Sequence, residues 1–208
     1  MMHGLDSMLD RCYIRWPFLF WQHRLIWLFL ERKTNFFSGN FDRVLHVAPE
    51  VFFEKKFRSV FKNRYLTADL NDPRAMVKMD VTNIKYPDNT FDVILCNHVL
   101  EHVQDDTGAM RELFRVLKTE GWAILNVPIR GIKTFEDPSV STEEERLRVY
   151  GHTEHVRNYG LDYLDRLQTA GFRVVGCNKN SFLKPYELEK FGLSSYEGLV
   201  VYCRKVHQ

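Results

Sequence analysis

Side chains that could take part in acid–base chemistry form a first group at Asn97–His102, directly after an apolar run. If this turn is helical, spacings of three and four residues place His98, Glu101 and His102 on one side of it. A histidine can accept a proton near neutral pH, so His98 is a candidate general base. We expect Glu101 and His102 to orient the loop. We expect no bound metal, because magnesium prefers oxygen ligands over a histidine at this position.

A second group lies later in the chain, within Tyr-Gly-His-Thr-Glu-His-Val-Arg-Asn-Tyr at residues 150–159. A guanidinium beside two imidazoles can hold a carboxylate or phosphate, and an imidazole can deprotonate a hydroxyl. We therefore predict His155 as a second catalytic residue, and His152, Arg157 and Tyr159 as acceptor-binding residues. The alternative is a capped helix start in which Arg157 pairs with an acid such as Glu154.

Alternating strands and helices must position these groups. Short apolar runs predict strands, and amphipathic segments between them predict helices. This order favours a doubly wound, Rossmann-like α/β sheet with right-handed crossovers. The predicted strands are Arg43–Ala48, Arg64–Asp69, Met76–Asp80, Phe91–Asn97, Trp122–Val127, Phe172–Cys177 and Gly198–Arg204, and the main helices are 50–62, 107–118 and a segment from about Tyr163 to Gly171.

Ligands of such sheets bind beyond the carboxyl ends of the strands, where this chain places two acids. Asp69 ends the second predicted strand, where a carboxylate can accept hydrogen bonds from both ribose hydroxyls. Asp80 ends the third, where it can bind the exocyclic amine of adenine while the Val81 N–H meets a ring nitrogen. The pair predicts a ligand that contains adenosine.

The loop after the first strand narrows the choice of ligand. It reads His46-Val-Ala48-Pro49-Glu50 and contains no glycine. A dinucleotide needs a glycine-rich loop for its pyrophosphate, and the anionic Glu50 would repel that group. S-adenosylmethionine has no phosphate and brings an ammonium and a sulfonium, which an acidic loop attracts. The electrostatics favour S-adenosylmethionine.

The segment around the fourth strand carries a family resemblance. Asp92–Val103, followed by Met110–Lys118 and Gly121, resembles the class I S-adenosylmethionine-dependent methyltransferases, in particular the type 11 group. The likeness runs from about Arg43 to Val127. It implies a seven-stranded sheet whose last strand is antiparallel.

The resemblance also implies roles for individual residues. Asp69, with the adjacent Leu70, is expected to bind the ribose, and Asp80 and Val81 the adenine. Asn97 and His98 are expected to line the junction between methyl donor and acceptor.

The first loop departs from the family pattern of an acid followed by glycines. His46, Ala48, Pro49 and Glu50 occupy it, and Ala48 is small enough for a ligand to approach. We expect Glu50 to replace the missing acid and bind the methionine ammonium, while N–H groups of the helix start take the carboxylate. The alternative is that Glu50 only complements the helix dipole.

Composition sets further limits. The net charge is +2, with 29 basic and 27 acidic residues, so no field typical of a nucleic-acid-binding protein is expected. The four cysteines form no C-x-x-C pair, which favours reduced thiols and a cytoplasmic protein without structural zinc.

An apolar aromatic segment precedes the sheet. Residues 16–30 include Trp16, Trp21 and Trp27, and Gln22–Arg24 interrupt them. The run is shorter than the ~20 residues needed to span a bilayer. Three alternatives stand: a helix packed on the domain, a lid over a pocket, or a peripheral membrane helix. We predict a helical extension at residues 1–40 and the methyltransferase domain at 41–208.

These observations predict an S-adenosylmethionine-dependent O- or N-methyltransferase with a small or medium-sized acceptor, for which a carbohydrate or lipid-linked intermediate is one option. The alternative is a catalytically inactive domain of the same fold that binds a partner or an adenosine metabolite, and the glycine-free loop supports it. An RNA acceptor is disfavoured because the chain has no basic patch interleaved with aromatic residues.

Overall fold

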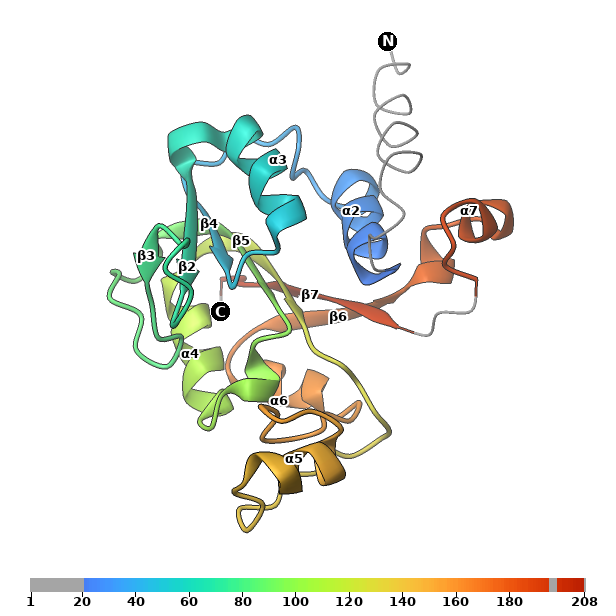
Figure 1. Cartoon of the computed structure of the whole chain (residues 1–208). Coiled ribbons are helices and arrows are strands. Elements are labelled where there is room, and N and C mark those ends of the chain that lie inside the picture. The colour runs from blue at the N-terminus through green and yellow to red at the C-terminus, as the bar shows by residue number, and fades with distance from the viewer. Residues whose placement is uncertain (1–20, 195–197, 208) are drawn as a thin grey trace. The chain divides into compact units, whose positions relative to one another are not determined.

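A seven-stranded sheet forms the centre of the computed structural model, which describes residues 21–194 and 198–207 (Figure 1). The strand order is β3-β2-β1-β4-β5-β7-β6. The strands are β1 (Val44–Val47), β2 (Tyr65–Asp69), β3 (Val77–Lys78), β4 (Phe91–Asn97), β5 (Leu117–Asn126), β6 (Arg173–Asn178) and β7 (Leu199–Arg204). The α-helices are α2 (Trp21–Lys33), α3 (Val51–Phe61), α4 (Asp106–Val116), α5 (Glu143–Tyr150), α6 (Tyr163–Thr169) and α7 (Pro185–Lys190).

The central strands are apolar on both faces, as expected of parallel strands covered by helices. β1 is buried throughout, and in β4 only Asp92 is partly exposed. β1 pairs in parallel with β2 and β4, and β4 pairs in parallel with β5. β7 runs antiparallel to β5, with Ala123 opposite Cys203. The predicted α/β class and the antiparallel last strand are therefore confirmed.

Register brings the predicted site residues to one edge of the sheet. Val47 is paired with Ala68 and Cys96, and Asn97 is paired with Asn126. The segments that follow β1, β2, β4 and β5 therefore emerge side by side. This is the edge at which doubly wound sheets bind ligands.

The junction between α4 and β5 differs from the prediction. The helix was expected to continue to Lys118, but it ends at Val116, and Leu117 already pairs with Phe91. Gly121 lies inside β5, where an added Cβ would be 2.7 Å from the Lys118 carbonyl oxygen and 2.9 Å from that of Asp92. The glycine is therefore needed for close backbone approach within the sheet, and it does not end the helix.

The start of α3 also differs slightly. The helix was predicted at residues 50–62, but Glu50 is its N-cap and the helix begins at Val51. The glutamate remains at the positive end of the helix dipole, where a carboxylate is stabilised.

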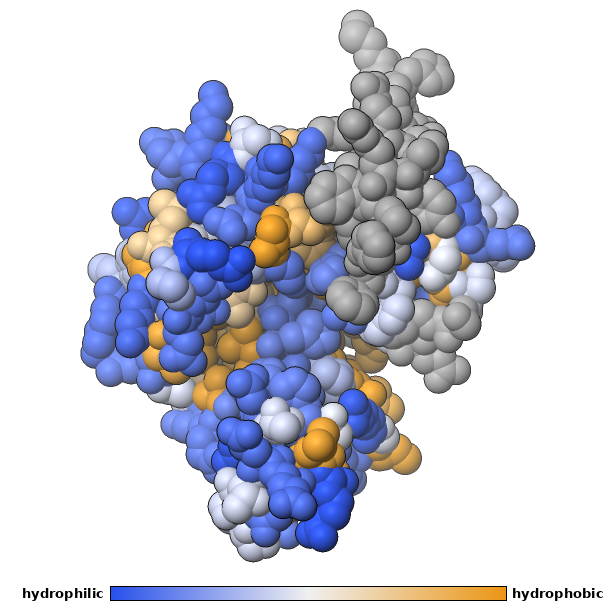
Figure 2. Space-filling model, viewed as in Figure 1, coloured by the Kyte–Doolittle hydropathy of each residue, from blue (hydrophilic) through white to orange (hydrophobic). Residues whose placement is uncertain are grey.

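The insertion between β5 and α6 contains α5, a helix with a polar surface. Thr142 accepts a hydrogen bond from the Glu145 N–H, and the Glu145 side chain accepts one from the Thr142 N–H, which completes a capping box. Hydrophilic residues cover most of this region on the face seen in Figure 2. The charged stretch at residues 142–148 thus belongs to a helix with a largely solvated surface.

The chain divides into two compact units. One contains the chain up to Gly39 together with Asn178–Val200, and the other contains Asn40–Cys177 and the end of β7. In the first unit, the Phe29 and Phe182 rings meet edge to face at 5.5 Å, and Arg32 pairs with Glu187 at 2.7 Å.

The apolar N-terminal segment lies partly within the described residues. Trp21–Lys33 is helical, while Trp16 lies outside the described residues. Within the described part, no helix is long and apolar enough to cross a bilayer.

Candidate functional site

A cavity of about 930 Å³ opens at the carboxyl edge of the sheet, within the second unit. Residues from several strand ends and from the β5–α6 insertion line it. They include Val47, Ala48, Asp69, Leu70, Asp80, Val81, Thr82, His98, His102, Gln104, Asp105, Glu143, Arg146, Thr153, Glu154 and Val156. The structure thus brings together six of the residues predicted from the sequence to bind the cofactor: Ala48, Asp69, Leu70, Asp80, Val81 and His98.

The two predicted ligand carboxylates are each held by a tight turn. Asp69 Oδ1 accepts hydrogen bonds from the N–H groups of Asn71 and Asp72, both at 2.7 Å. Asp80 Oδ1 accepts from the N–H and the hydroxyl of Thr82, at 2.8 and 2.7 Å. The second oxygen of each carboxylate accepts no hydrogen bond from the described residues. Each acid is therefore oriented through one oxygen and can bind a ligand through the other.

Two non-glycine residues at the cavity have left-handed backbone conformations. Ala48, after β1, has φ 46°, and His98, after β4, has φ 55°. Such conformations cost an L-residue roughly 1–2 kcal/mol and often occur at functional sites. The Ala48 N–H donates to the Ala68 carbonyl at 2.8 Å, which fixes the turn on the neighbouring strand. The loop thus adopts a glycine-type turn without a glycine.

Glu50 is the end of a buried hydrogen-bond chain. His46 Nδ1 lies 2.6 Å from the Tyr65 hydroxyl, and His46 Nε2 lies 2.8 Å from Glu50 Oε2. Asn97 Nδ2 donates to Glu50 Oε1 at 3.3 Å. His46 is completely buried, and it does not line the cavity. The arrangement supports a role for His46 in holding Glu50 and does not support direct cofactor contact.

The same region retains an unsatisfied acceptor. Asn97 Oδ1 is buried and accepts no hydrogen bond within the described part of the chain, an arrangement that is costly. Glu50 and Asn97 thus present a carboxylate and a free amide oxygen at the ends of β1 and β4, which is a suitable environment for an ammonium. Glu50, Asn97 and Pro49 do not themselves line the cavity.

His98 is coupled to a buried carboxylate. Its Nδ1 lies 3.3 Å from Glu101 Oε1, and Glu101 is only 1% exposed. Burial lowers the pKa of His98, but the hydrogen bond and charge of Glu101, with the charge of Glu50, outweigh it and hold the pKa above its ordinary value. With Nδ1 directed at Glu101, Nε2 is the ring atom that remains for proton exchange with a ligand.

Arg157 and Tyr159, predicted to bind an acceptor, are buried beside the cavity and do not line it. Arg157 donates to the carbonyls of Leu100 (3.1 Å), Val103 and Gln104 (2.9 Å). This geometry supports a positioning role: the guanidinium fixes the loop that carries Glu101 and His102. The alternative, in which Arg157 pairs with an acid, holds for the pairing: among the described residues its partners are Glu136 at 2.9 Å and Asp106 at 3.7 Å, and not Glu154.

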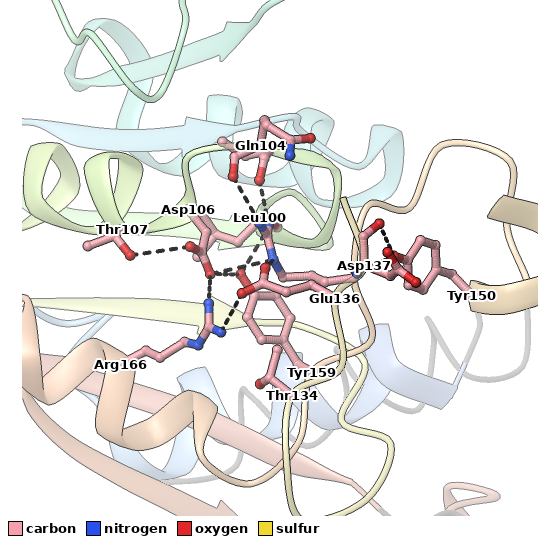
Figure 3. Close-up of polar contacts among 12 residues, drawn as sticks. Leu100, Gln104, Asp106, Thr107, Thr134, Glu136, Asp137, Tyr150, Tyr159 and Arg166 are labelled. Carbon is pink, nitrogen blue, oxygen red and sulfur yellow. Dashed lines mark hydrogen bonds and ion pairs between the residues drawn. The ribbon is translucent and has the colours of Figure 1, made fainter. Parts of the chain in front are cut away.

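Asp106, Glu136 and Arg166 form a partly buried ionic network around Tyr159 (Figure 3). Arg157 pairs with both acids of this network. Asp106 Oδ2 accepts from the Tyr159 hydroxyl at 2.7 Å and from Arg166 Nη1 at 2.8 Å. Glu136 bridges Arg157 and Arg166, both at 2.9 Å. Partial burial raises the pKa of Glu136, but the two guanidinium groups outweigh it and keep the pKa below its ordinary value.

The remaining predicted residues, His152 and His155, lie next to His102. The His102 and His155 rings are 4.7 Å apart, and the His152 and His155 rings stack at 4.5 Å. His155 is 8% exposed, and burial, with His102, His152 and Arg130 nearby, lowers its pKa to about 4. The two histidines themselves do not line the cavity, whereas their neighbours Thr153, Glu154 and Val156 do.

Some cavity residues were missed in the sequence. Glu143 and Arg146 of α5 line the cavity, and neither was among the residues predicted for the site. Gln104 and Asp105 follow the Asn97–His102 group and were also not predicted. The one sequence signal that could have identified Gln104 and Asp105 is their position directly after the predicted Asn97–His102 group.

Comparisons with known proteins agree with this geometry. Residues 35–125 match a family model described as a methyltransferase domain, of type 11. A phosphoethanolamine N-methyltransferase of Triticum aestivum is 33% identical over 115 residues, 53% of this chain and 21% of the relative. Phosphoethanolamine N-methyltransferase 1 of Arabidopsis thaliana is 35% identical over 97 residues, 46% of this chain and 18% of the relative. The chain thus spans about one fifth of these relatives.

Solved structures share the fold at low sequence identity. An S-adenosylmethionine-dependent methyltransferase of Mesorhizobium loti aligns with a TM-score of 0.55 and 14% identity, over 81% of this chain and 92% of that chain. Phosphoethanolamine N-methyltransferase 2 of Haemonchus contortus, in complex with S-adenosyl-L-methionine, aligns with a TM-score of 0.56 and 12% identity, over 89% of this chain and 53% of that chain.

Proposed function

We propose a function from the premise that the chain belongs to the class I S-adenosylmethionine-dependent methyltransferases of the type 11 group. The chain transfers a methyl group to a small-molecule acceptor in the cavity at the sheet edge. The observation that carries the proposal is the convergence of Ala48, Asp69, Asp80, Val81 and His98 on this one cavity. S-adenosylmethionine is the cofactor of the family.

The residues present fit this cofactor. Asp69 and Asp80 each keep one carboxylate oxygen free of hydrogen bonds within the described chain, which suits ribose hydroxyls and the adenine amine respectively. Val81 is 6% exposed and adds an apolar wall beside the adenine position. When bound, the cofactor supplies a methyl group made electrophilic by its sulfonium.

Glu50 is proposed to bind the methionine ammonium, with Asn97 beside it. The support is the carboxylate held by His46 and the unsatisfied amide oxygen of Asn97. Glu50→Gln keeps the shape of the side chain and removes its charge. We expect weaker binding of S-adenosylmethionine with little change in thermal stability, measured by titration calorimetry and by melting. A lower melting temperature with unchanged affinity for S-adenosylmethionine would favour the alternative that Glu50 only complements the helix dipole.

The chain's own contribution to the reaction is to hold the acceptor in line and to accept a proton. With Asp69, Asp80 and Glu50 holding it, S-adenosylmethionine would supply its methyl carbon to an acceptor lone pair, and its sulfur would keep the electron pair of the broken bond. An amine or hydroxyl acceptor must lose one proton, and His98 Nε2 is the proposed site that takes it. Alignment and close approach supply much of the rate.

For the acceptor, we propose a small amine or a hydroxyl compound. The support for an amine is that the two plant relatives are named phosphoethanolamine N-methyltransferases, although the chain matches only about one fifth of their length. A carbohydrate or lipid-linked hydroxyl remains the second option.

Product formation tests the proposal. Purified protein is incubated with S-adenosylmethionine and a panel of small amines, phosphoethanolamine and hydroxyl compounds, and S-adenosylhomocysteine is measured. We expect turnover with at least one acceptor, and a loss of turnover in His98→Gln that is much larger than any loss of cofactor affinity. Equal turnover in His98→Gln would remove His98 from the proton transfer.

An inactive domain that binds an adenosine metabolite is the second candidate function. The observation that favours it is the glycine-free loop, in which Glu50 is already bonded within the protein. Saturable cofactor binding without turnover, across the panel and with cell extract, would support this candidate over the enzyme.

A further inference from the structure

Three imidazole side chains converge beside the cavity. His102, His152 and His155 each present one ring nitrogen, and these nitrogens all lie within 4.8 Å of one another. The proposed cofactor contacts use none of them. The cluster borders the cavity through His102 itself and through Thr153, Glu154 and Val156.

Two of the three histidines are fixed by the surrounding structure. The Val156 N–H donates to the Glu101 carbonyl at 2.9 Å, which joins the segment of His155 to the turn of His102. Arg157 adds three hydrogen bonds to carbonyls of the same turn, from Leu100 to Gln104. The third histidine, His152, lies exposed on the loop after α5. The cluster therefore combines two anchored imidazoles with one that can adjust.

We propose that His102, His152 and His155 bind a transition-metal dication of the zinc class. Three imidazoles suit zinc, cobalt, nickel or copper and do not suit magnesium or calcium. A tetrahedral zinc ion with nitrogen ligands needs them roughly 3.3 Å apart, so the observed nitrogens require a small closing movement.

The exposed histidine provides that movement. His152 Nδ1 accepts a hydrogen bond from the Glu154 N–H at 3.1 Å, and its ring must turn from this amide to bind the metal. The His152 side chain is exposed, and its ring packs on the other two members of the cluster, His102 and His155, so the turn is a small one.

Nearby carboxylates offset the charge of the ion. Glu101 is 1% exposed, and its Oε2 accepts no hydrogen bond from the described residues. Glu154 Oε2 lies 4.0 Å from His102 Nδ1, where it can orient that ring as outer carboxylates orient metal-bound histidines. With three protein ligands, the fourth position remains for water or for an oxygen of the acceptor at the cavity. Only this last point rests on the proposed function.

The test uses the full chain without a histidine tag, freed of metal by a chelator. Co²⁺ is titrated with visible absorption as the readout, and Zn²⁺ is added in competition. We expect one equivalent of Co²⁺ to bind with the intense bands of a tetrahedral site, and Zn²⁺ to displace it. His152→Ala should weaken Zn²⁺ binding by at least about tenfold, while the exposed His207→Ala, a matched control, should leave it unchanged.

His152→Ala changes an exposed side chain, so the variant tests the site even if changes at the buried His155 prevent folding. Absence of saturable Co²⁺ and Zn²⁺ binding, or equal affinity in His152→Ala and the wild-type protein, would overturn the proposal. Titration of the metal-free protein with S-adenosylmethionine separates the two proposals, because the cofactor residues lie outside the histidine cluster.

Discussion

His98 shows how one side chain combines strain, burial and charge. Its backbone is left-handed, its ring contacts a buried carboxylate, and it lines the cavity. Each feature alone is common in proteins. Together they favour a functional position, because strained residues with a shifted pKa cluster at sites where chemistry occurs.

The first prediction concerns the pH dependence of methyl transfer. A protonated His98 cannot accept a proton, so the rate should fall as pH decreases through its raised pKa. Glu101→Gln removes the charge and weakens the hydrogen bond that raise this pKa, and leaves burial, which lowers it. We expect the acid limb of the rate profile to move to lower pH, as measured by S-adenosylhomocysteine formation between mildly acidic and neutral pH.

The control is Glu154→Gln, because the Glu154 side chain is 75% exposed and is not among the groups that shift the pKa of His98. An acid limb that stays in place in Glu101→Gln, or moves equally in Glu154→Gln, would contradict the assignment of His98 as the base.

At the scale of elements, the loop between β1 and α3 departs most from the family pattern and still keeps its geometry. Ala48 adopts a positive φ in a turn fixed by a hydrogen bond to Ala68. The loop can therefore retain the shape needed for a ligand while it stores backbone strain.

The second prediction is that Ala48→Gly stabilises the protein. The left-handed conformation costs alanine about 1–2 kcal/mol, and the greater freedom of glycine in the unfolded chain offsets about 0.4–1 kcal/mol of this. Urea unfolding should show a net gain of up to about 1.6 kcal/mol. Ala170→Gly, at an ordinary φ of −75°, should lose stability. A loss in both variants would mean that Ala48 is not strained.

The third prediction concerns the loop that carries Glu101 and His102. Lysine cannot reproduce the fork by which Arg157 binds three carbonyls, so Arg157→Lys should reduce the free energy of unfolding by about 1–3 kcal/mol. Hydrogen exchange at residues 100–104 should also become faster. Arg166→Lys is the control, because Arg166 shares Asp106 and Glu136 with Arg157, and within the described residues its side chain donates to these two acids and not to the loop carbonyls. Equal effects of the two variants on exchange would contradict the positioning role.

The sequence predicted the regular elements better than the burial of individual polar residues. Phe91–Asn97 could be recognised as a strand because its apolar run is long and clearly bounded. Leu117 fits an apolar helix face equally well, and only its pairing with Phe91 assigns it to β5. Local pattern does not contain that long-range contact.

For the site as well, local sequence pattern predicted some residues and long-range packing determined others. The acids Asp69 and Asp80 were found because each ends a predicted strand, and strand ends meet at one edge of a parallel sheet. In the structure Asp69 ends β2, whereas β3 already ends at Lys78 and Asp80 lies two residues beyond it. Arg157 and Tyr159 were interpreted as acceptor ligands, whereas the structure buries both against partners such as Asp106, about fifty residues earlier in the chain. Burial of this kind depends on tertiary packing and has no sequence signal.

For the whole molecule, one of the two compact units supplies the cavity of the proposed activity. All residues that line the cavity belong to the unit of Asn40–Cys177, whereas α2 and α7 belong to the other. The matched family model covers residues 35–125, which carry the strand-end residues of the cavity. The central claim, that this cavity binds S-adenosylmethionine, can therefore be tested through a single carboxylate.

The most direct measurement is calorimetric titration of the protein with S-adenosylmethionine, repeated on Asp69→Ala and Asp72→Ala. Loss of charged hydrogen bonds to the ribose, worth about 1.5–3 kcal/mol, should weaken binding to Asp69→Ala by roughly 10- to 100-fold. Asp72 is paired with Arg74 and does not line the cavity, so its variant should bind like the wild-type protein. No saturable binding to the folded wild-type protein, or equal affinity in Asp69→Ala, would contradict the account.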